Sequence, residues 1–221
     1  VRGIDENGEF AERTLKGLKI GCHLLGDTSR PSTHKIRYRV ENRSLLRVNQ
    51  FRRHAISSEI QEKILDKARD IFPKTDLLIL SDFNYGTLPD HLLERLIQLA
   101  RKHEIFVSAD SQCSSQLGNI GRFHGVDLLT PTEHEARVSL QDSESGLVVL
   151  ADRLRLQTQA EHVLLTLNRD GLLIHAGPED SWVTDQLPAL NRNPVDVAGA
   201  GDCLLVAASL ARCNGATIWE A

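Results

Sequence analysis

The chain has 221 residues, of which 41% are hydrophobic, and its 26 lysines and arginines against 30 aspartates and glutamates give a net charge of −4. This length is enough for one large domain, or for one domain with a small appendage. The near balance of charge, without a long run of one sign, indicates neither a nucleic-acid partner nor a membrane surface.

Targeting signals and cysteine patterns are also absent from the sequence. No apolar stretch reaches the roughly 20 residues of a membrane span, and the first residues lack the apolar core of a signal peptide, so we expect a cytoplasmic protein. The four cysteines have no CxxC spacing, which indicates neither a zinc site nor a disulfide framework; they are Cys22, Cys113, Cys203 and Cys213.

The first quarter of the chain predicts a helix followed by a hairpin. Residues 1–16 predict a helix with Phe10, Leu15 and Leu18 buried. Residues 33–40 and 44–49 then predict two antiparallel strands. Lys35 and Arg37 lie on the first of these strands, where they face either an anionic ligand or, as is more usual for such side chains, solvent.

From Ser58 onward, helical patterns alternate with apolar runs. Helices are predicted at residues 59–70 and 89–102, and buried parallel strands at 76–82, 105–109 and 126–129. This alternation predicts a doubly wound sheet with helices on its faces and with ligands at the carboxyl ends of its strands. Asp82 and Asp110 end two of these strands, where they either hold ligand hydroxyls or a hydrated Mg²⁺, or only terminate the strand.

The third quarter of the chain continues the same alternation. Thr132 and Glu135 have the spacing of a capping box at the start of a helix. A helix over residues 146–160 and a strand over 162–167 follow. The Asp170-Gly171 pair is typical of a tight turn, and it leads from that strand into another over 172–175.

Near the end, the stretch 196–202 joins a polar loop to an apolar run that predicts a buried helix over 203–213. Gly199 and Gly201 lack a Cβ, so another group can come close to their amides. The first amides of a helix favour a phosphate or a developing oxyanion. A carboxylate beside them, Asp202, could orient or deprotonate an attacking hydroxyl; alternatively, Asp202 only caps the helix.

This stretch resembles the signature of the ribokinase-like (PfkB) carbohydrate kinases, which is similar to Asp-Thr-x-Gly-Ala-Gly-Asp, with Val197 in place of the threonine. Three other segments, 30–37, 45–49 and 80–86, resemble the D-glycero-D-manno-heptose 7-phosphate kinase branch of that family. The sequence departs from the branch at Tyr85 and Gln112, where the family has lysines, and from the family's Asn-x-x-Glu motif at Thr132.

The resemblance implies a three-layer α/β/α ribokinase-like fold with a small β lid. Residues 1–221 would form one incomplete kinase domain, with residues 30–52 as the lid hairpin. It further suggests ATP-dependent phosphoryl transfer to a hydroxyl of a sugar or sugar phosphate, with Mg²⁺, and a homodimer formed through the lid.

The resemblance also assigns roles to individual residues. Asp202 would be the catalytic base, and the amides of Gly199, Ala200 and Gly201 would hold the transferring phosphoryl group. The expected metal ligands are Glu135 and Asp196. The nucleotide would contact Thr132, Glu135, Thr166, Asn168 and Gly171, and the sugar or its phosphate would contact Lys35, Arg37, Asp82 and Asp110.

Two other functions remain open from the residues alone. The departures from the family pattern are compatible with a catalytically impaired homologue that binds a sugar or a nucleotide. A nicotinamide-dependent oxidoreductase is a weaker alternative, because no Gly-x-Gly-x-x-Gly follows a predicted strand.

Overall fold

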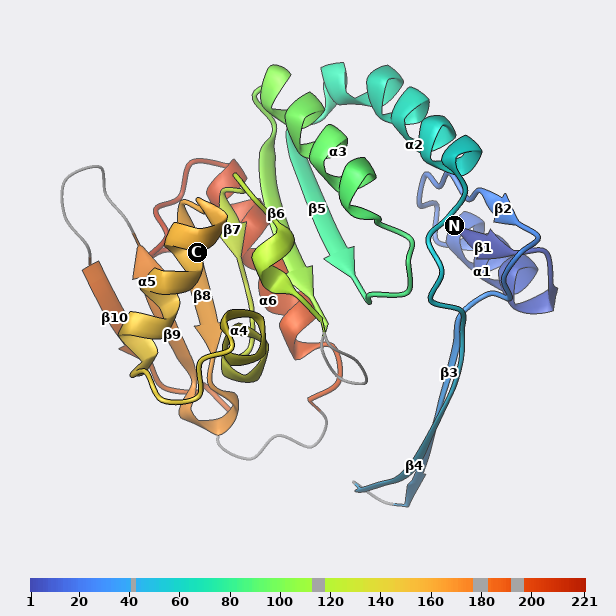
Figure 1. Ribbon diagram of the computed structural model, residues 1–221. Helices are drawn as coiled ribbons and strands as arrows, with labels where there is room; N and C mark the ends of the chain where they lie inside the picture. The colour runs from blue at the N-terminus through green and yellow to red at the C-terminus, as the bar shows by residue number, and fades with distance from the viewer. Residues whose placement is uncertain (41–42, 113–117, 177–182, 192–196) are drawn as a thin grey trace. The chain divides into compact units, whose positions relative to one another are not determined.

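In the computed structural model, the described residues are 1–221 without 41–42, 113–117, 177–182 and 192–196. The chain divides into two compact units (Figure 1). The first comprises Val1–Ile64 and Tyr85–Pro89, and the second comprises Leu65–Asn84 and Asp90–Ala221. The helix α2 (Ser58–Ile71) contains one boundary between them.

The first unit begins with a short helix and a two-stranded parallel sheet. Strands β1 (Arg2–Gly3) and β2 (Gly26–Asp27) pair in parallel, and α1 (Glu6–Gly17) follows β1. Asp5 caps α1 by accepting a hydrogen bond from the Gly8 amide at 2.9 Å, which explains why the helix begins later than the pattern predicted.

The predicted burial of α1 is wrong at two positions. Phe10 is 64% exposed and Leu18 is 65% exposed. The buried residue of the helix is instead Gly8, where an added Cβ would lie 2.5 Å from the carbonyl oxygen of Gly3. The helix therefore packs on its neighbours through a residue without a side chain, which hydrophobic periodicity cannot reveal.

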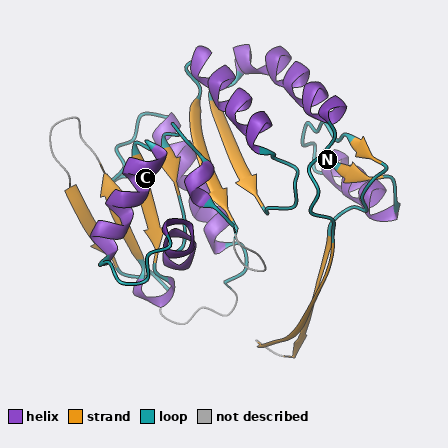
Figure 2. Cartoon of the chain, in the orientation of Figure 1, coloured by secondary structure: helices purple, strands orange, loops and turns teal. Residues whose placement is uncertain are grey.

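The predicted hairpin is confirmed. Strands β3 (His34–Val40) and β4 (Arg43–Gln50) pair antiparallel, with a register shift between Tyr38 and Arg39. They form a separate two-stranded sheet, which is drawn as a long ribbon in Figure 2.

The second unit contains a six-stranded mixed sheet in the order β10-β9-β8-β7-β6-β5. Four of its strands are parallel to one another: β5 (Leu77–Asp82), β6 (Phe106–Ser111), β7 (Leu128–Leu129) and β8 (His162–Thr166). The strands β9 (Leu172–Ala176) and β10 (Val183–Leu187) add antiparallel pairs at one edge. The sequence did not predict β10, whose residues are mostly polar.

Helices cover both faces of this sheet, as predicted. Figure 1 shows α3 (Asp90–Lys102), α4 (Glu133–Leu140) and α5 (Leu147–Thr158) on one face and α6 (Ala200–Cys213) on the other. Three short 3₁₀ turns complete the described elements: η1 (Phe72–Lys74), η2 (Ile120–Arg122) and η3 (Asn168–Asp170). None of the helices among the described residues is both long and apolar enough to cross a membrane.

The core of the second unit lies between the sheet and its helices. Leu128, Leu164 and Ile174 of three adjacent strands pack with Ala208 of α6. The prediction of a buried helix over 203–213 is only half right, because α6 buries one face and leaves Val206 and Leu210 exposed. The sheet covers only the side of α6 that faces it.

Candidate functional site

The parallel strands of the second unit bring their carboxyl ends to one edge of the sheet. Asp82 is the last residue of β5, and Asp110 lies inside β6, opposite Ser81, rather than just beyond its strand as predicted. Thr130 follows β7, and Thr166 ends β8. Three of the residues selected from the sequence as ligand contacts, Asp82, Asp110 and Thr166, therefore share this edge.

A group of carboxylates meets at this edge. Burial raises the pKa of Asp110 to about 7, and the negative charges of Glu135 and Asp202 add to the shift. These three side chains come from β6, α4 and α6, so the fold assembles them from residues far apart in the sequence. Charges of one sign held together favour a proton or a cation between them.

The arrangement of these carboxylates fits a cation held through water better than one held directly. Among the described residues, no three His, Cys, Asp or Glu side chains are placed to ligate a metal ion together. Mg²⁺ usually keeps several waters and needs only one or two protein carboxylates. Glu135 and Asp110 suit that role, whereas the other predicted ligand, Asp196, lies outside the described residues.

Glu135 is held rigidly by the capping box that the sequence predicted. Its Oε2 accepts hydrogen bonds from the Thr132 amide and hydroxyl, both at 2.8 Å, and its own amide donates to Thr132 Oγ1 at 3.2 Å. The amide of Thr166 donates to the carbonyl oxygen of Pro131 at 2.8 Å, and Thr166 pairs with Thr132 in an isolated parallel β-bridge. Three predicted nucleotide contacts, Thr132, Glu135 and Thr166, therefore lie side by side.

The turn after β8 has a clear structural role. Asn168 adopts a positive φ of 55° and Gly171 one of 96°. The Leu167 amide donates to the Gly171 carbonyl at 2.8 Å and closes the turn. A Cβ on Gly171 would lie 2.0 Å from the carbonyl oxygen of Leu187, so glycine is required here whether or not a nucleotide binds.

The N-terminus of α6 is open. Gly199 is the N-cap, with φ of 82° and no side-chain hydrogen bond to the helix. The Ala200 amide donates to Val197 O at 3.2 Å and the Cys203 amide to Gly199 O at 2.9 Å, which leaves the amides of Gly201 and Asp202 without a backbone acceptor among the described residues. A Cβ on Gly199 or Gly201 would meet no atom of the described residues within 4 Å. An anion can therefore reach these amides, with the exposed Asp202 beside them.

Asp82 is already engaged by its neighbours. Its Oδ1 accepts a hydrogen bond from the Asn84 amide at 2.9 Å, and its Oδ2 accepts one from Arg122 at 3.2 Å. Burial nevertheless raises the pKa of this carboxyl group, which the Asn84 amide and Arg122 only partly offset. No local pattern points to Arg122, because 40 residues separate it from its partner Asp82.

The predicted substrate contacts Lys35 and Arg37 belong to the first unit. The Lys35 ammonium lies 5.2 Å from the centre of the Tyr85 ring, which in turn stacks on Phe51 with the ring centres 4.3 Å apart. Arg37 is exposed on the hairpin. Tyr85 is buried, so the residue that replaces the expected lysine packs at the base of the hairpin.

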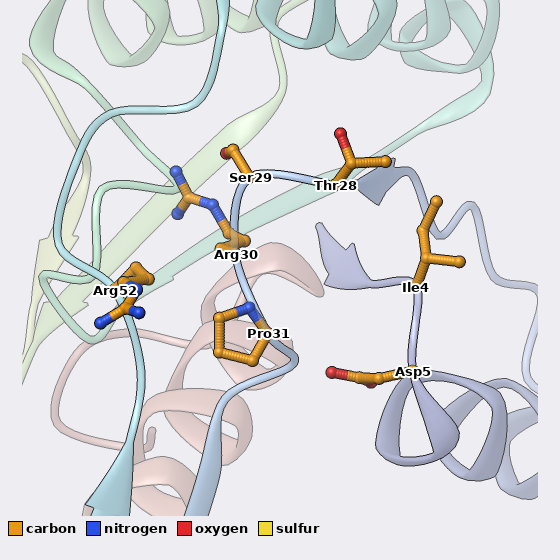
Figure 3. Close-up of a pocket in the computed structure, with 7 residues that line it drawn as sticks. All are labelled: Ile4, Asp5, Thr28, Ser29, Arg30, Pro31 and Arg52. Atoms are coloured by element: carbon orange, nitrogen blue, oxygen red, sulfur yellow. The ribbon is translucent and has the colours of Figure 1, made fainter.

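The first unit also contains a hollow of about 470 Å³, whose lining residues are labelled in Figure 3. Two arginines line it, Arg30 and Arg52. The guanidinium group of Arg30 binds Asp27 at 2.7 Å and donates to the carbonyl oxygens of Tyr85 and His54, so the charge of Arg30 is used within the fold. The edge of the six-stranded sheet, where several predicted ligand contacts meet, is the stronger candidate.

The sequence matches a family model over nearly its full length. The pfkB family carbohydrate kinase model matches residues 2–221. Among curated proteins, the bifunctional protein HldE of Helicobacter hepaticus is 30% identical over 226 residues, covering 100% of this chain and 45% of that protein. HldE of Geotalea uraniireducens is 29% identical, covering 100% and 44%. The chain thus spans a little under half the length of these relatives.

Solved structures show the same fold. Phosphofructokinase-2 from Escherichia coli in complex with potassium superposes with a TM-score of 0.77 at 16% identity, covering 99% of this chain and 69% of that one. Ribokinase from Thermotoga maritima gives a TM-score of 0.71 at 18% identity, covering 99% and 68%. The predicted ribokinase-like α/β fold is therefore confirmed.

Proposed function

The chain belongs to the pfkB family of carbohydrate kinases, and we propose that it transfers the γ-phosphoryl group of ATP to a hydroxyl of a sugar phosphate of the heptose 7-phosphate type. The observation that carries this proposal is the uncapped N-terminus of α6, where two glycines leave amides open beside an exposed carboxylate. An anion-binding terminus next to a base is the arrangement that phosphoryl transfer to a hydroxyl needs.

Within this proposal, Asp202 takes the proton of the attacking hydroxyl. Of the three donors expected from the resemblance, Gly199, Ala200 and Gly201, the Ala200 amide already donates to Val197 O, so the phosphoryl group is held mainly by the open amides of Gly201 and Asp202. Positioning and charge stabilisation then supply most of the rate. Bound Mg²⁺ would neutralise charge on the nucleotide phosphates. Glu135, fixed by its capping box, and Asp110 orient the waters around the ion.

The test replaces the base while keeping its shape. In the full-length protein, Asp202→Asn should lower turnover by roughly 10²–10⁴-fold, the range for a positioned general base, and leave ATP and sugar affinities within a few-fold. ADP release by a coupled assay and binding by calorimetry measure the two effects separately. Asp185→Asn, a matched change on the exposed strand β10, should leave both unchanged. An Asp202→Asn protein that keeps most of its turnover would exclude this assignment.

The impaired homologue remains the second candidate, and one observation favours it. Tyr85 is buried against Phe51, so the position where heptose kinases carry a lysine supplies no charge. In that case the wild-type protein binds ATP or a sugar phosphate in calorimetry but releases no ADP. ADP release by the wild-type protein favours the kinase, and binding without ADP release favours the impaired homologue.

We further propose that the protein acts in the cytoplasm, where ATP is available, and that it forms a homodimer through the hairpin. Exposed apolar side chains on β3 and β4 support the dimer, with Tyr38 opposite Leu46 and Val48 two residues further along β4. Leu46→Glu should convert the dimer to a monomer, as measured by light scattering after gel filtration. A wild-type protein that is monomeric at micromolar concentration would rule the dimer out.

A further inference from the structure

The hairpin has two chemically different faces. Residues directly opposite each other across an antiparallel pair lie on the same face, and neighbours along a strand alternate. Ile36 pairs with Val48 and Tyr38 with Leu46, which makes one face apolar. On the other face, Arg37 pairs directly with Arg47. Arg37 was a predicted substrate contact, whereas Arg47 was not.

This arginine pair is unfavourable without a ligand. Like charges directly opposite on adjacent strands destabilise the pairing, because their Cβ atoms are only about 4.5–5.5 Å apart. The two strand sequences, HKIRYRV and RSLLRVNQ, contain no acidic residue. Both arginines are exposed, and within the described part of the chain neither makes an ion pair. The hairpin therefore keeps two cations together that no acidic side chain of the described residues neutralises.

A compact anion with several oxygens would offset the repulsion between these two arginines. A phosphate monoester accepts paired hydrogen bonds from guanidinium groups, and two arginines at this spacing can share one phosphate. Lys35 and Asn49 form the next pair on the same face, two residues away, and the Lys35 ammonium lies over the Tyr85 ring. The amide group of Asn49 is suited to the hydroxyls next to such a phosphate, because it both donates and accepts hydrogen bonds.

We infer that Arg47 and Arg37 together bind the phosphate that the sugar substrate already carries, and that this pair makes the protein selective for sugar phosphates over neutral sugars. This inference rests on the proposed function for the identity of the substrate. It adds Arg47 as a specificity-determining residue, and it assigns the cationic face of the hairpin to the phosphate that is not transferred.

Binding without nucleotide tests the pair independently of turnover. The full-length protein is titrated with D-glycero-D-manno-heptose 7-phosphate, fructose 6-phosphate and ribose 5-phosphate, and with the corresponding neutral sugars. For whichever phosphate binds most tightly, Arg47→Gln should weaken binding by about 10- to 100-fold, the loss expected for charge-assisted hydrogen bonds, and should change the neutral sugar less than about three-fold. Arg37→Gln should behave in the same way. The double variant should lose less than the product of the single losses, because both groups bind one phosphate.

A control and a second readout separate this role from general effects of charge. Arg13→Gln removes an exposed arginine from α1 in the same unit and should change neither affinity. Without ligand, Arg47→Gln should unfold at the same or a higher temperature than wild type, because it removes a like-charge pair. The sugar phosphate should then raise the melting temperature of wild type much more than that of the variant.

Three results would overturn the inference. The wild-type protein could bind no sugar phosphate more tightly than the corresponding neutral sugar, or Arg47→Gln could weaken binding of the sugar phosphate and of the neutral sugar equally. The third is a loss of affinity in Arg47→Gln that is fully explained by dissociation of the dimer. None of these decides whether phosphoryl is transferred, which the Asp202→Asn assay measures. If sugar phosphates bind through Arg47 without ADP release, the pair is confirmed on an impaired homologue.

Discussion

Replacing Gly201 by alanine separates what the N-terminus of α6 contributes to folding from what it contributes to function. Gly201 lies in the first turn of the helix, and a Cβ added there meets no described atom within 4 Å. Alanine is favoured over glycine in a helix by about 0.5–1 kcal/mol, so Gly201→Ala should stabilise the protein by about that much. For a chain of this size, that corresponds to a rise of roughly 1–4 °C in melting temperature.

The same methyl group should damage activity. It would stand beside the amides of Gly201 and Asp202, the donors that lack a backbone acceptor among the described residues. Loss of one such donor to a developing negative charge costs about 10²–10³-fold in turnover, so we expect a loss of that order together with the stabilisation. Calorimetry and a coupled ADP assay on one preparation measure both.

A matched control is available in the first unit. Gly17 is the last residue of α1, and a Cβ there also meets no atom within 4 Å. Gly17→Ala should therefore leave turnover unchanged, with no loss of stability. If Gly201→Ala is more stable and fully active, no ligand approaches these amides closely, and the reasoning for an anion site at α6 fails.

Three further predictions concern Gly171, Asp110 and Cys203. Gly171→Ala should lower the free energy of unfolding by more than about 2 kcal/mol, because the added Cβ would clash with the carbonyl oxygen of Leu187. Gly215 also has a positive φ, 86°, but no close described neighbour, so Gly215→Ala should cost only about 1–2 kcal/mol. Equal losses in chemical denaturation would contradict the contact with Leu187. The pKa of Asp110 is raised to about 7, so the folded state binds a proton more tightly than the unfolded state, and stability falls as the pH rises from about 4 to about 7. In Mg²⁺-free buffer, the melting temperature of Asp110→Asn relative to wild type should then rise between about pH 5 and about pH 8, whereas a constant difference would refute the shift. ATP with Mg²⁺ should slow alkylation of Cys203 more than that of Cys22, as measured by peptide mapping, and no selective protection would mean that the phosphates do not cover this turn.

The sequence predicted the parts of the fold whose signals are local. A continuous apolar run is typical of a parallel strand with both faces covered, and the run Leu77–Leu80 allowed β5 to be recognised, although only Leu80 of these four residues is fully buried. The capping box of α4 was predicted from the spacing of Thr132 and Glu135, and its hydrogen bonds are confirmed. Both signals are contained within a few residues of chain.

The features that the sequence did not predict depend on contacts between distant segments. The strand β10 has little apolar pattern of its own and forms by pairing with β9. Arg122 binds Asp82 across 40 residues, and Tyr85 stacks on Phe51 across 34. Arg47 became interesting only when the strand register placed it opposite Arg37. In each case the residue type was visible in the sequence, but its partner was not.

The two helices that supply the candidate site show why the anion is assigned to α6 rather than to α4. Both contribute a carboxylate whose charge reaches Asp110. At the N-terminus of α4, the Thr132 hydroxyl accepts from the Glu135 amide, and the Glu135 carboxylate accepts from Thr132, so the capping box already places a negative charge where an anion would bind. At α6, the N-cap is Gly199, which offers no side chain, and Asp202 is exposed. The same helix-end chemistry is therefore satisfied internally at α4, where it fixes the carboxylate of Glu135 that we propose for ordering the Mg²⁺ waters, and left open at α6, where we propose that it receives a phosphoryl group.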